Sequence, residues 1–186
     1  GLGGCTFCNN ASFNARTQTQ QSIREQLESS KPGMRAKRYL AYFQAYTNTY
    51  AEVETLRQMY QEALEVADIA GLCVGTRPDC VPDATLDLLA SYQDQGAEVW
   101  LELGLQSAFD ATLERINRGH NFAAYVDAVQ RAQARNLKIC THLIIGLPGE
   151  APSDSLITLD RVLEQGCQGL KLHPLHIVRG SQMARQ

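Results

Sequence analysis

Two cysteines separated by two residues, Cys5 and Cys8, are the residues of this sequence best suited to chemistry. An aromatic residue, Phe7, lies between them, and Gly3-Gly4 precedes them. Two thiols at this spacing can direct both sulfur atoms to one centre: a metal ion, an iron–sulfur cluster or each other as a disulfide. The pair alone leaves these three chemistries open, together with a loop that carries incidental thiols.

Four further cysteines are scattered along the chain. They are Cys73, Cys80, Cys140 and Cys167. Cys73 and Cys140 lie within apolar runs, which favours buried, reduced thiols and a reducing, cytoplasmic compartment. Three histidines match no recognised spacing of metal ligands and receive no role: His120, His173 and His176.

The composition is that of one globular domain. The chain has 186 residues, of which 44% are hydrophobic and 20% charged. Its formal net charge of −3 gives no broad attraction to nucleic acid. No apolar run of about eighteen residues occurs, so we expect no membrane span. The phosphate loop GxxxxGKS/T and the GxGxxG fingerprint are both absent from the sequence, which disfavours nucleotide chemistry of those kinds.

The positions of these cysteines depend on strands and helices that alternate along the chain. Apolar runs predict five strands, at residues 39–43, 69–74, 98–104, 138–145 and 169–175. Helical periodicity predicts helices at 17–28, 51–67, 83–95 (capped by Asp83), 109–116, 122–135 and 153–165. A repeat of roughly 30 residues is typical of βα units in a parallel sheet.

The carboxyl ends of the predicted strands are more polar and richer in Gly and Pro than the strands themselves. Parallel sheets bind ligands at these ends. The segments are Thr47-Asn48, Thr76-Arg77, Gly104-Leu105-Gln106, Gly146-Leu147-Pro148 and His173-Pro174. The sequence therefore predicts a ligand-binding rim along one edge of the sheet.

Five blocks in this order resemble radical S-adenosylmethionine (SAM) enzymes. The match is most specific to the branch with elongator-type tRNA-modifying enzymes and oxygen-independent coproporphyrinogen oxidase, and within it to YhcC-like proteins. The blocks are Gly4 to Cys8, Thr76 to Asp79, Leu103 to Ser107 with Asn117 to His120, Ile145 to Glu150, and Lys171 to Leu175.

The resemblance implies an α/β fold, a partial parallel (β/α)6-type barrel that lacks its first strand. Residues 1–186 would form a radical SAM core domain. The sequence begins without Met inside a glycine-rich loop and ends without an evident stop, so we expect a fragment of a longer protein.

Members of this family hold a [4Fe–4S] cluster through three cysteines, and the fourth iron binds SAM. An electron from an external donor such as flavodoxin or ferredoxin cleaves SAM to methionine and a 5′-deoxyadenosyl radical. By resemblance, Cys5 and Cys8 are the second and third cluster ligands, and tRNA is a candidate substrate. No cysteine precedes Cys5, and Cys80 is the only cysteine placed to substitute. We therefore expect the chain as given to lack a complete cluster site.

The resemblance also implies cofactor-binding residues: Phe7, Asn48, Glu102, Gln106, Arg118, His142, Ile144 and Leu175. Some have a plainer interpretation. Glu102 could be a buried carboxylate paired with an interior cation, and Arg118 a solvated loop residue. His142 and Ile144 could be core residues. The sequence departs from related enzymes at Ala45 to Asn48 and at Gly75, where relatives have a Gly-Gly-Thr-Pro motif and a glutamate.

Two other classes of protein remain as alternatives. A dithiol oxidoreductase would use Cys5 and Cys8, although no helix is expected to begin at Cys8, as thioredoxin-like folds require. A zinc- or RNA-binding module would need a second Cys or His pair or a basic–aromatic segment, and neither stands out.

Overall fold

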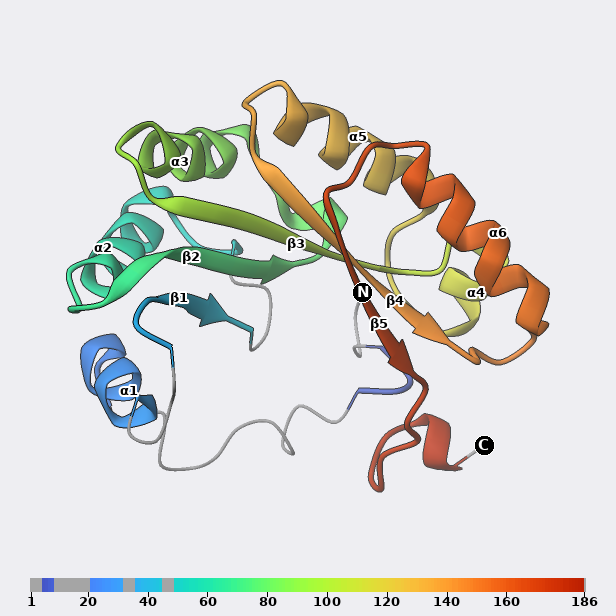
Figure 1. Cartoon of the computed structure of the whole chain (residues 1–186). Coiled ribbons are helices and arrows are strands. Elements are labelled where there is room, and N and C mark those ends of the chain that lie inside the picture. Colours follow the sequence, from blue (N-terminus) through green and yellow to red (C-terminus); the bar gives the residue numbers. More distant parts are fainter. Residues whose placement is uncertain (1–4, 9–20, 32–35, 45–48, 186) are drawn as a thin grey trace.

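The structure is a computed structural model, and it describes residues 5–8, 21–31, 36–44 and 49–185. Five parallel strands form one sheet in chain order (Figure 1). The strands are β1 (Tyr39–Phe43), β2 (Ile69–Thr76), β3 (Glu98–Gln106), β4 (Lys138–Ile145) and β5 (Gly169–Pro174). The expected partial parallel barrel is confirmed, and β1 and β2 are neighbours as predicted.

The helices alternate with these strands, as the sequence predicts. They are α1 (Ile23–Ser30), α2 (Val53–Leu64), α3 (Asp83–Asp94), α4 (Asp110–Arg115), α5 (Phe122–Gln133) and α6 (Pro152–Leu163), with short 3-10 turns η3 (Pro78–Cys80) and η4 (Met183–Arg185). Helices α2, α3, α5 and α6 lie on the convex side of the curved sheet (Figure 1). Among the described residues, none of the helices has both the length and the apolar character needed to cross a bilayer.

The start of α1 and the capping of α3 differ most from the prediction. Helix α1 begins at Ile23 because Ser22 and Glu25 form a capping box, in which each side chain accepts the other's backbone amide. Residues 17–20 of the predicted helix lie outside the described residues. Asp83 is the first residue of α3 and not its cap; its carboxylate instead pairs with Arg131 of α5 at 3.1 Å.

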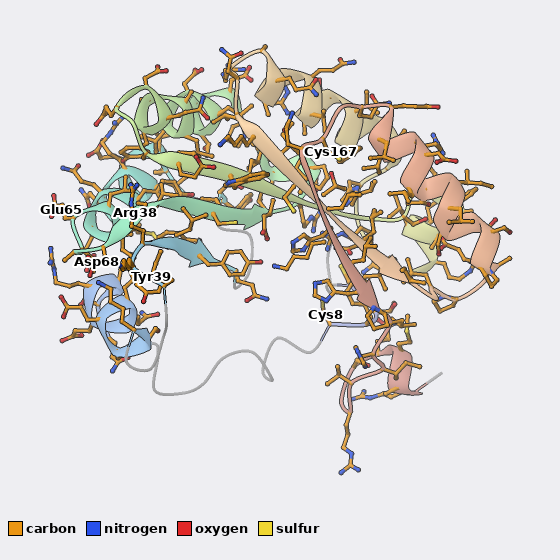
Figure 2. The ribbon with its side chains drawn as sticks, in the orientation of Figure 1. Cys8, Arg38, Tyr39, Glu65, Asp68 and Cys167 are labelled. Atoms are coloured by element: carbon orange, nitrogen blue, oxygen red, sulfur yellow. The ribbon has the colours of Figure 1, made fainter. Side chains whose placement is uncertain are left out.

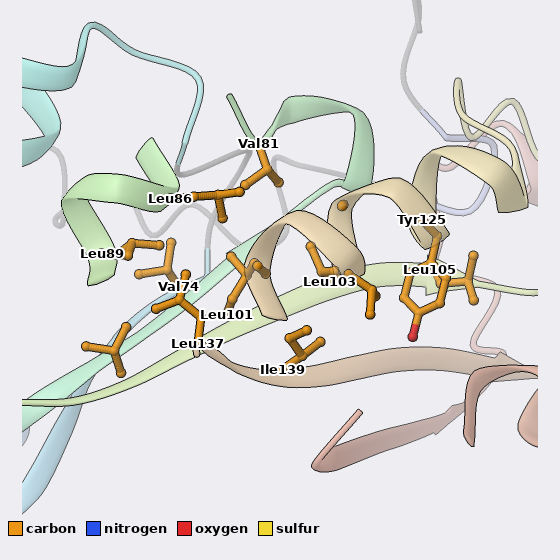
Figure 3. Close-up of a cluster of buried hydrophobic side chains, with 14 of the residues drawn as sticks. Val74, Val81, Leu86, Leu89, Leu101, Leu103, Leu105, Tyr125, Leu137 and Ile139 are labelled. Carbon is orange, nitrogen blue, oxygen red and sulfur yellow. The ribbon is translucent and has the colours of Figure 1, made fainter. Parts of the chain in front are cut away.

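The core lies between the convex face of the sheet and the helices. Leu101 and Leu103 of β3 and Ile139 of β4 are fully buried there (Figure 3). Tyr125 of α5 packs into the same core, and its hydroxyl lies 2.7 Å from the Thr141 hydroxyl. Burial of these side chains attaches the helices to one face only, which leaves the other face of the sheet for polar groups.

The concave face carries the alternate residues of each strand. On β3 these are Glu98, Trp100, Glu102 and Gly104, because successive side chains point to opposite faces. Cys73 and Cys140 are half-buried free thiols, so the expectation that both are buried is wrong. Their apolar neighbours face the core, whereas the two thiols share the concave face with Glu102.

Candidate functional site

The Cys5–Cys8 loop lies at the carboxyl-terminal edge of the sheet. The Thr6 amide donates a hydrogen bond to the Ile116 carbonyl (3.0 Å), and the Met183 amide donates one to the Thr6 carbonyl (2.8 Å). Within the loop, the Cys8 amide donates to the Cys5 carbonyl (3.1 Å). Segments from the middle and the end of the chain therefore hold the two thiols in place.

Arg118 joins this loop to β3. It is only 8% exposed, so it is not the solvated loop residue of the plainer interpretation. Its Nη1 donates to Cys5 Sγ at 3.2 Å, and its Nη2 donates to the Gly104 carbonyl at 2.6 Å. Its Nε lies 3.1 Å from both the Gly104 carbonyl and His120 Nε2. A buried guanidinium thus sits directly against one candidate cluster ligand.

The approach of Arg118 depends on Gly104. The register between β3 and β4 shifts between Gly104 and Gln106, and Gln106 has a φ of 78°. A Cβ atom at Gly104 would lie 2.5 Å from Arg118 Nη2 and 3.0 Å from Gln106 Nε2. A larger residue at position 104 would therefore force the ends of the Arg118 and Gln106 side chains to move from these positions.

Replacement of Gly104 by Ala is expected to displace Arg118 and to destabilise the fold by about 1–3 kcal/mol, the usual cost of overpacking. Denaturant unfolding of the cluster-free chain measures this cost. Gly75→Ala on β2 is the matched control, because a Cβ there would meet only the Phe43 carbonyl, at 3.2 Å, among close contacts. Equal stability of the two variants would contradict the steric role assigned to Gly104.

The two thiols have opposite proton affinities. A hydrogen bond from Cys8 is the largest influence on Cys5, and it acts with the Arg118 and Arg77 charges against burial to lower the pKa of Cys5 to about 5. The same hydrogen bond, with burial and the Cys5 charge, raises the pKa of Cys8. At neutral pH Cys5 is therefore a thiolate and Cys8 its proton donor. Burial and the Arg118 charge lower the pKa of His120 to about 4, so this ring is neutral.

Glu102 lies deeper on the concave face and meets one side chain from each of the other four strands. Its Oε2 accepts a hydrogen bond from Tyr42 of β1 at 2.6 Å. Its carboxylate also hydrogen-bonds Cys73 of β2. The same Oε2 lies 2.8 Å from His142 Nε2 of β4 and 3.5 Å from Lys171 Nζ of β5. Glu102 is therefore paired with an interior cation, as its plainer interpretation expects, and that cation is Lys171.

This network keeps Glu102 ionised. Burial by itself raises the pKa of Glu102, but His142, Tyr42 and Cys73 together lower it more, to about 2. Burial and the neighbouring carboxylate raise the pKa of Tyr42 and of Cys73, so both keep their protons and donate. Lys171 also donates to the Tyr42 hydroxyl at 2.7 Å and lies 4.4 Å from the centre of its ring.

The remaining predicted cofactor residues are distributed along the same edge. Phe7 and Leu175 are partly buried against the core, and the Leu175 amide donates to the Ile145 carbonyl at 2.8 Å. Gln106 and Ile144 line a cavity of about 110 Å³ beside α6. Asn48 lies outside the described residues. A cavity of this size is too small for a nucleoside ligand.

A larger cavity, of about 430 Å³, lies at the other edge of the sheet. Arg38, Tyr39, Glu98 and Trp100 contribute to its lining. Figure 2 shows Arg38 and Tyr39 at the start of β1, far from Cys8. Parallel sheets bind ligands at their carboxyl ends, so this cavity at the amino ends is not assigned to the site.

Sequence reasoning missed Tyr42 and Lys171, and it gave Cys73 and Cys140 only the role of buried thiols. Each contacts Glu102 or lies beside it on the concave face. The alternation of side chains along each strand was the available signal. Using it required the strand register, which places Glu102 opposite Cys140 and His142 opposite Lys171.

Comparisons with known proteins bear on the family and the fold of this chain. The Radical SAM superfamily model matches residues 2–162. Protein YhcC of Escherichia coli K12 is 64% identical over 186 residues, which is 100% of this chain and 60% of that protein. The chain thus spans about 60% of the length of this curated relative.

Two solved structures share the fold. Elp3 from the archaeon Methanocaldococcus infernus has a TM-score of 0.73 at 20% identity, over 88% of this chain and 43% of that one. Coproporphyrinogen III oxidase (HemN) from Escherichia coli, described as a radical SAM enzyme, has a TM-score of 0.68 at 17% identity, over 94% and 42%. At these identities the two structures support the fold alone.

Proposed function

Because this chain belongs to the radical SAM superfamily, we propose that it forms part of an enzyme that cleaves SAM reductively. Cys5 and Cys8 would supply two thiolate ligands of a [4Fe–4S] cluster. When bound, the cluster would supply the electron that splits SAM into methionine and a 5′-deoxyadenosyl radical. The electron would come from an external donor such as flavodoxin or ferredoxin.

The observation that carries this proposal is the hydrogen bond from the buried Arg118 guanidinium to the partly buried Cys5. Cluster ligands must be thiolates, and a thiolate in a partly buried site needs a compensating positive charge. Arg118 provides that charge at 3.2 Å from Cys5 Sγ. The residues present therefore fit two of the three ligands that the family uses.

The same elements would position SAM. Arg118 and Gln106 lie together beside Gly104, next to the cysteine loop. Glu102 and His142 lie on the concave face of the adjoining strands, where the family resemblance places the nucleoside. Phe7, Ile144 and Leu175 would supply apolar contacts, and Asn48 belongs to the same proposed set. The role of these chain residues would be to bind and orient the cofactor and to exclude water from it.

The substrate is a separate part of the proposal. The resemblance to elongator-type enzymes makes tRNA the first substrate class to test. The net charge of −3 gives no independent support for it. Binding of tRNA would thus require local basic groups or parts of the protein outside these residues.

A dithiol oxidoreductase is the second candidate, because a low-pKa Cys5 next to a proton-donating Cys8 is also a redox-active arrangement.

Anaerobic reconstitution of the full-length protein with iron and sulfide separates the radical SAM enzyme from the dithiol oxidoreductase. A brown chromophore and release of 5′-deoxyadenosine from SAM under dithionite are expected. Cys5→Ser should abolish both, whereas Cys167→Ser, at a thiol outside the proposed site, should retain them. A reversible disulfide or tightly bound zinc without a cluster would refute the proposal.

A further inference from the structure

A second group of potential metal ligands lies on the concave face, apart from the Cys5–Cys8 pair. Glu102, Cys140 and His142 each offer one ligand atom, and the three atoms lie within 4.8 Å of one another. Among the described residues, this is the only set of three Cys, His, Asp or Glu side chains with such convergence. Ligand atoms around a tetrahedral zinc ion lie about 3–4 Å apart, so small side-chain movements would suffice.

The sheet itself sets this convergence. Glu102 of β3 pairs in register with Cys140 of β4, and His142 follows two residues later on the same face. Ligands on adjacent strands of a sheet are held more rigidly than ligands on loops. Glu102 is 7% exposed, and the other two side chains are half-buried.

The contact between His142 and Glu102 is unusual. His142 Nε2 is buried and makes no hydrogen bond of acceptable geometry, although it lies 2.8 Å from Glu102 Oε2. Lys171 Nζ already lies 3.5 Å from the same carboxylate oxygen, so a metal ion at this point would compete with that ammonium for Glu102.

We propose that Glu102, Cys140 and His142 bind one divalent transition-metal ion of the zinc class. Thiolate, imidazole and carboxylate together form the mixed sulfur, nitrogen and oxygen set that zinc prefers. Binding replaces the Cys140 thiol proton with the ion, and that proton leaves to solvent. Three protein ligands leave a fourth position for water or for an oxygen or nitrogen atom of a ligand on the concave face.

Lys171 opposes this ion and provides a sharp test. Its ammonium lies 3.5 Å from Glu102 Oε2 and carries the positive charge that a metal would supply. Removal of this charge should strengthen metal binding. If Glu102 and Lys171 form only a structural ion pair, their separation would not create any affinity for metal. Lys171→Met is therefore expected to tighten metal binding by about tenfold or more.

The experiment uses the 186-residue chain with Cys5→Ser and Cys8→Ser, so that the other thiol pair cannot bind metal. Co²⁺ is the probe, because a thiolate ligand gives a charge-transfer band in the near ultraviolet. Zn²⁺ is then added in competition. A single equivalent of Co²⁺ is expected to bind with this band, and Zn²⁺ should displace it and raise the thermal unfolding temperature.

Variants of this double mutant identify the ligands. Cys140→Ser should lose the charge-transfer band, and His142→Ala should weaken Zn²⁺ binding at least about tenfold. Cys167→Ser is the matched control, since Cys167 is also half-buried but hydrogen-bonds Thr141 on the opposite face of β4. Cys167→Ser should bind Co²⁺ and Zn²⁺ as tightly as the Cys5→Ser, Cys8→Ser chain does.

Two results would overturn the inference. One is the absence of both the cobalt band and the zinc-dependent stabilisation in the double mutant. The other is metal binding that Cys140→Ser and His142→Ala leave unchanged. Far-ultraviolet circular dichroism of each variant separates lost ligands from lost folding. No step uses SAM, iron or a reductant, so failure of this test is distinguishable from failure of the proposed function. Glu102 and His142 belong to both proposals, and a bound ion would occupy the two side chains that are proposed to orient SAM.

Discussion

The 186-residue chain is expected to take up little or no stable [4Fe–4S] cluster and to release no 5′-deoxyadenosine from SAM. The family's site uses three thiolates, and only Cys5 and Cys8 of this chain match them. Fusion of an upstream segment that carries one further cysteine at the family's spacing should restore both properties. Iron and sulfide content after anaerobic reconstitution and 5′-deoxyadenosine release under dithionite are the measurements.

Cys80 is the alternative source of a third cluster ligand within the 186-residue chain. It follows β2, and its side chain and that of Cys5 both interact electrostatically with Arg77, so the two thiols share one edge of the sheet. Cys80→Ser in the extended protein should leave the cluster intact. Near-stoichiometric cluster in the 186-residue chain that is lost on Cys80→Ser would show that the three-cysteine assignment is wrong.

Replacement of Arg118 by Gln is expected to raise the pKa of Cys5 from about 5 by roughly 1–3 units. Cys8 makes the largest contribution to the low pKa, so Cys8→Ala should raise it further. The thiolate is the nucleophile, so the alkylation rate of Cys5 rises as pH increases through its pKa. The pH profile of iodoacetamide labelling at Cys5, read by mass spectrometry on the cluster-free chain, measures the shift.

Arg135→Gln is the control for this experiment, because Arg135 pairs with Asp83 and Asp87 on the helical side of the sheet. Its labelling profile should match that of the unmodified chain. In the reconstituted full-length protein, Arg118→Gln should also weaken SAM binding at least about tenfold, because a charged hydrogen-bond donor is lost. If Arg118→Gln changed neither the pH profile of Cys5 labelling nor the affinity for SAM, Arg118 would not belong to the proposed site.

The order of the elements and the bounds of most strands could be predicted from the sequence. The bounds of β1 and β4 match the prediction, and β2 and β3 each extend two residues beyond it. Hydrophobic periodicity is a local property, so it can be found in the sequence alone. Strands that alternate with helices are typical of a parallel sheet. The start of α1 was wrong because the Ser22–Glu25 capping box outweighs the periodicity that precedes it.

The sequence by itself also identified Cys5, Cys8, Arg118, Glu102 and His142 as candidates for chemistry, from residue types at strand ends and from family resemblance. Their roles in the cluster and in SAM binding remain predictions. What the sequence determined is thus part of the set of reactive side chains and the edge of the sheet near which they lie, whereas Tyr42 and Lys171 were missed.

Only the tertiary structure decided which of these side chains meet. Arg118 contacts Cys5 across 113 residues of chain, and the same guanidinium hydrogen-bonds the Gly104 carbonyl beside the register shift between β3 and β4. Tyr42 and Lys171 reach Glu102 from the two outer strands of the sheet. Strand register is a non-local property, and a shift of one residue moves every side chain of a strand to the other face. Local patterns could therefore name the residues, whereas the pairing of distant strands set their contacts.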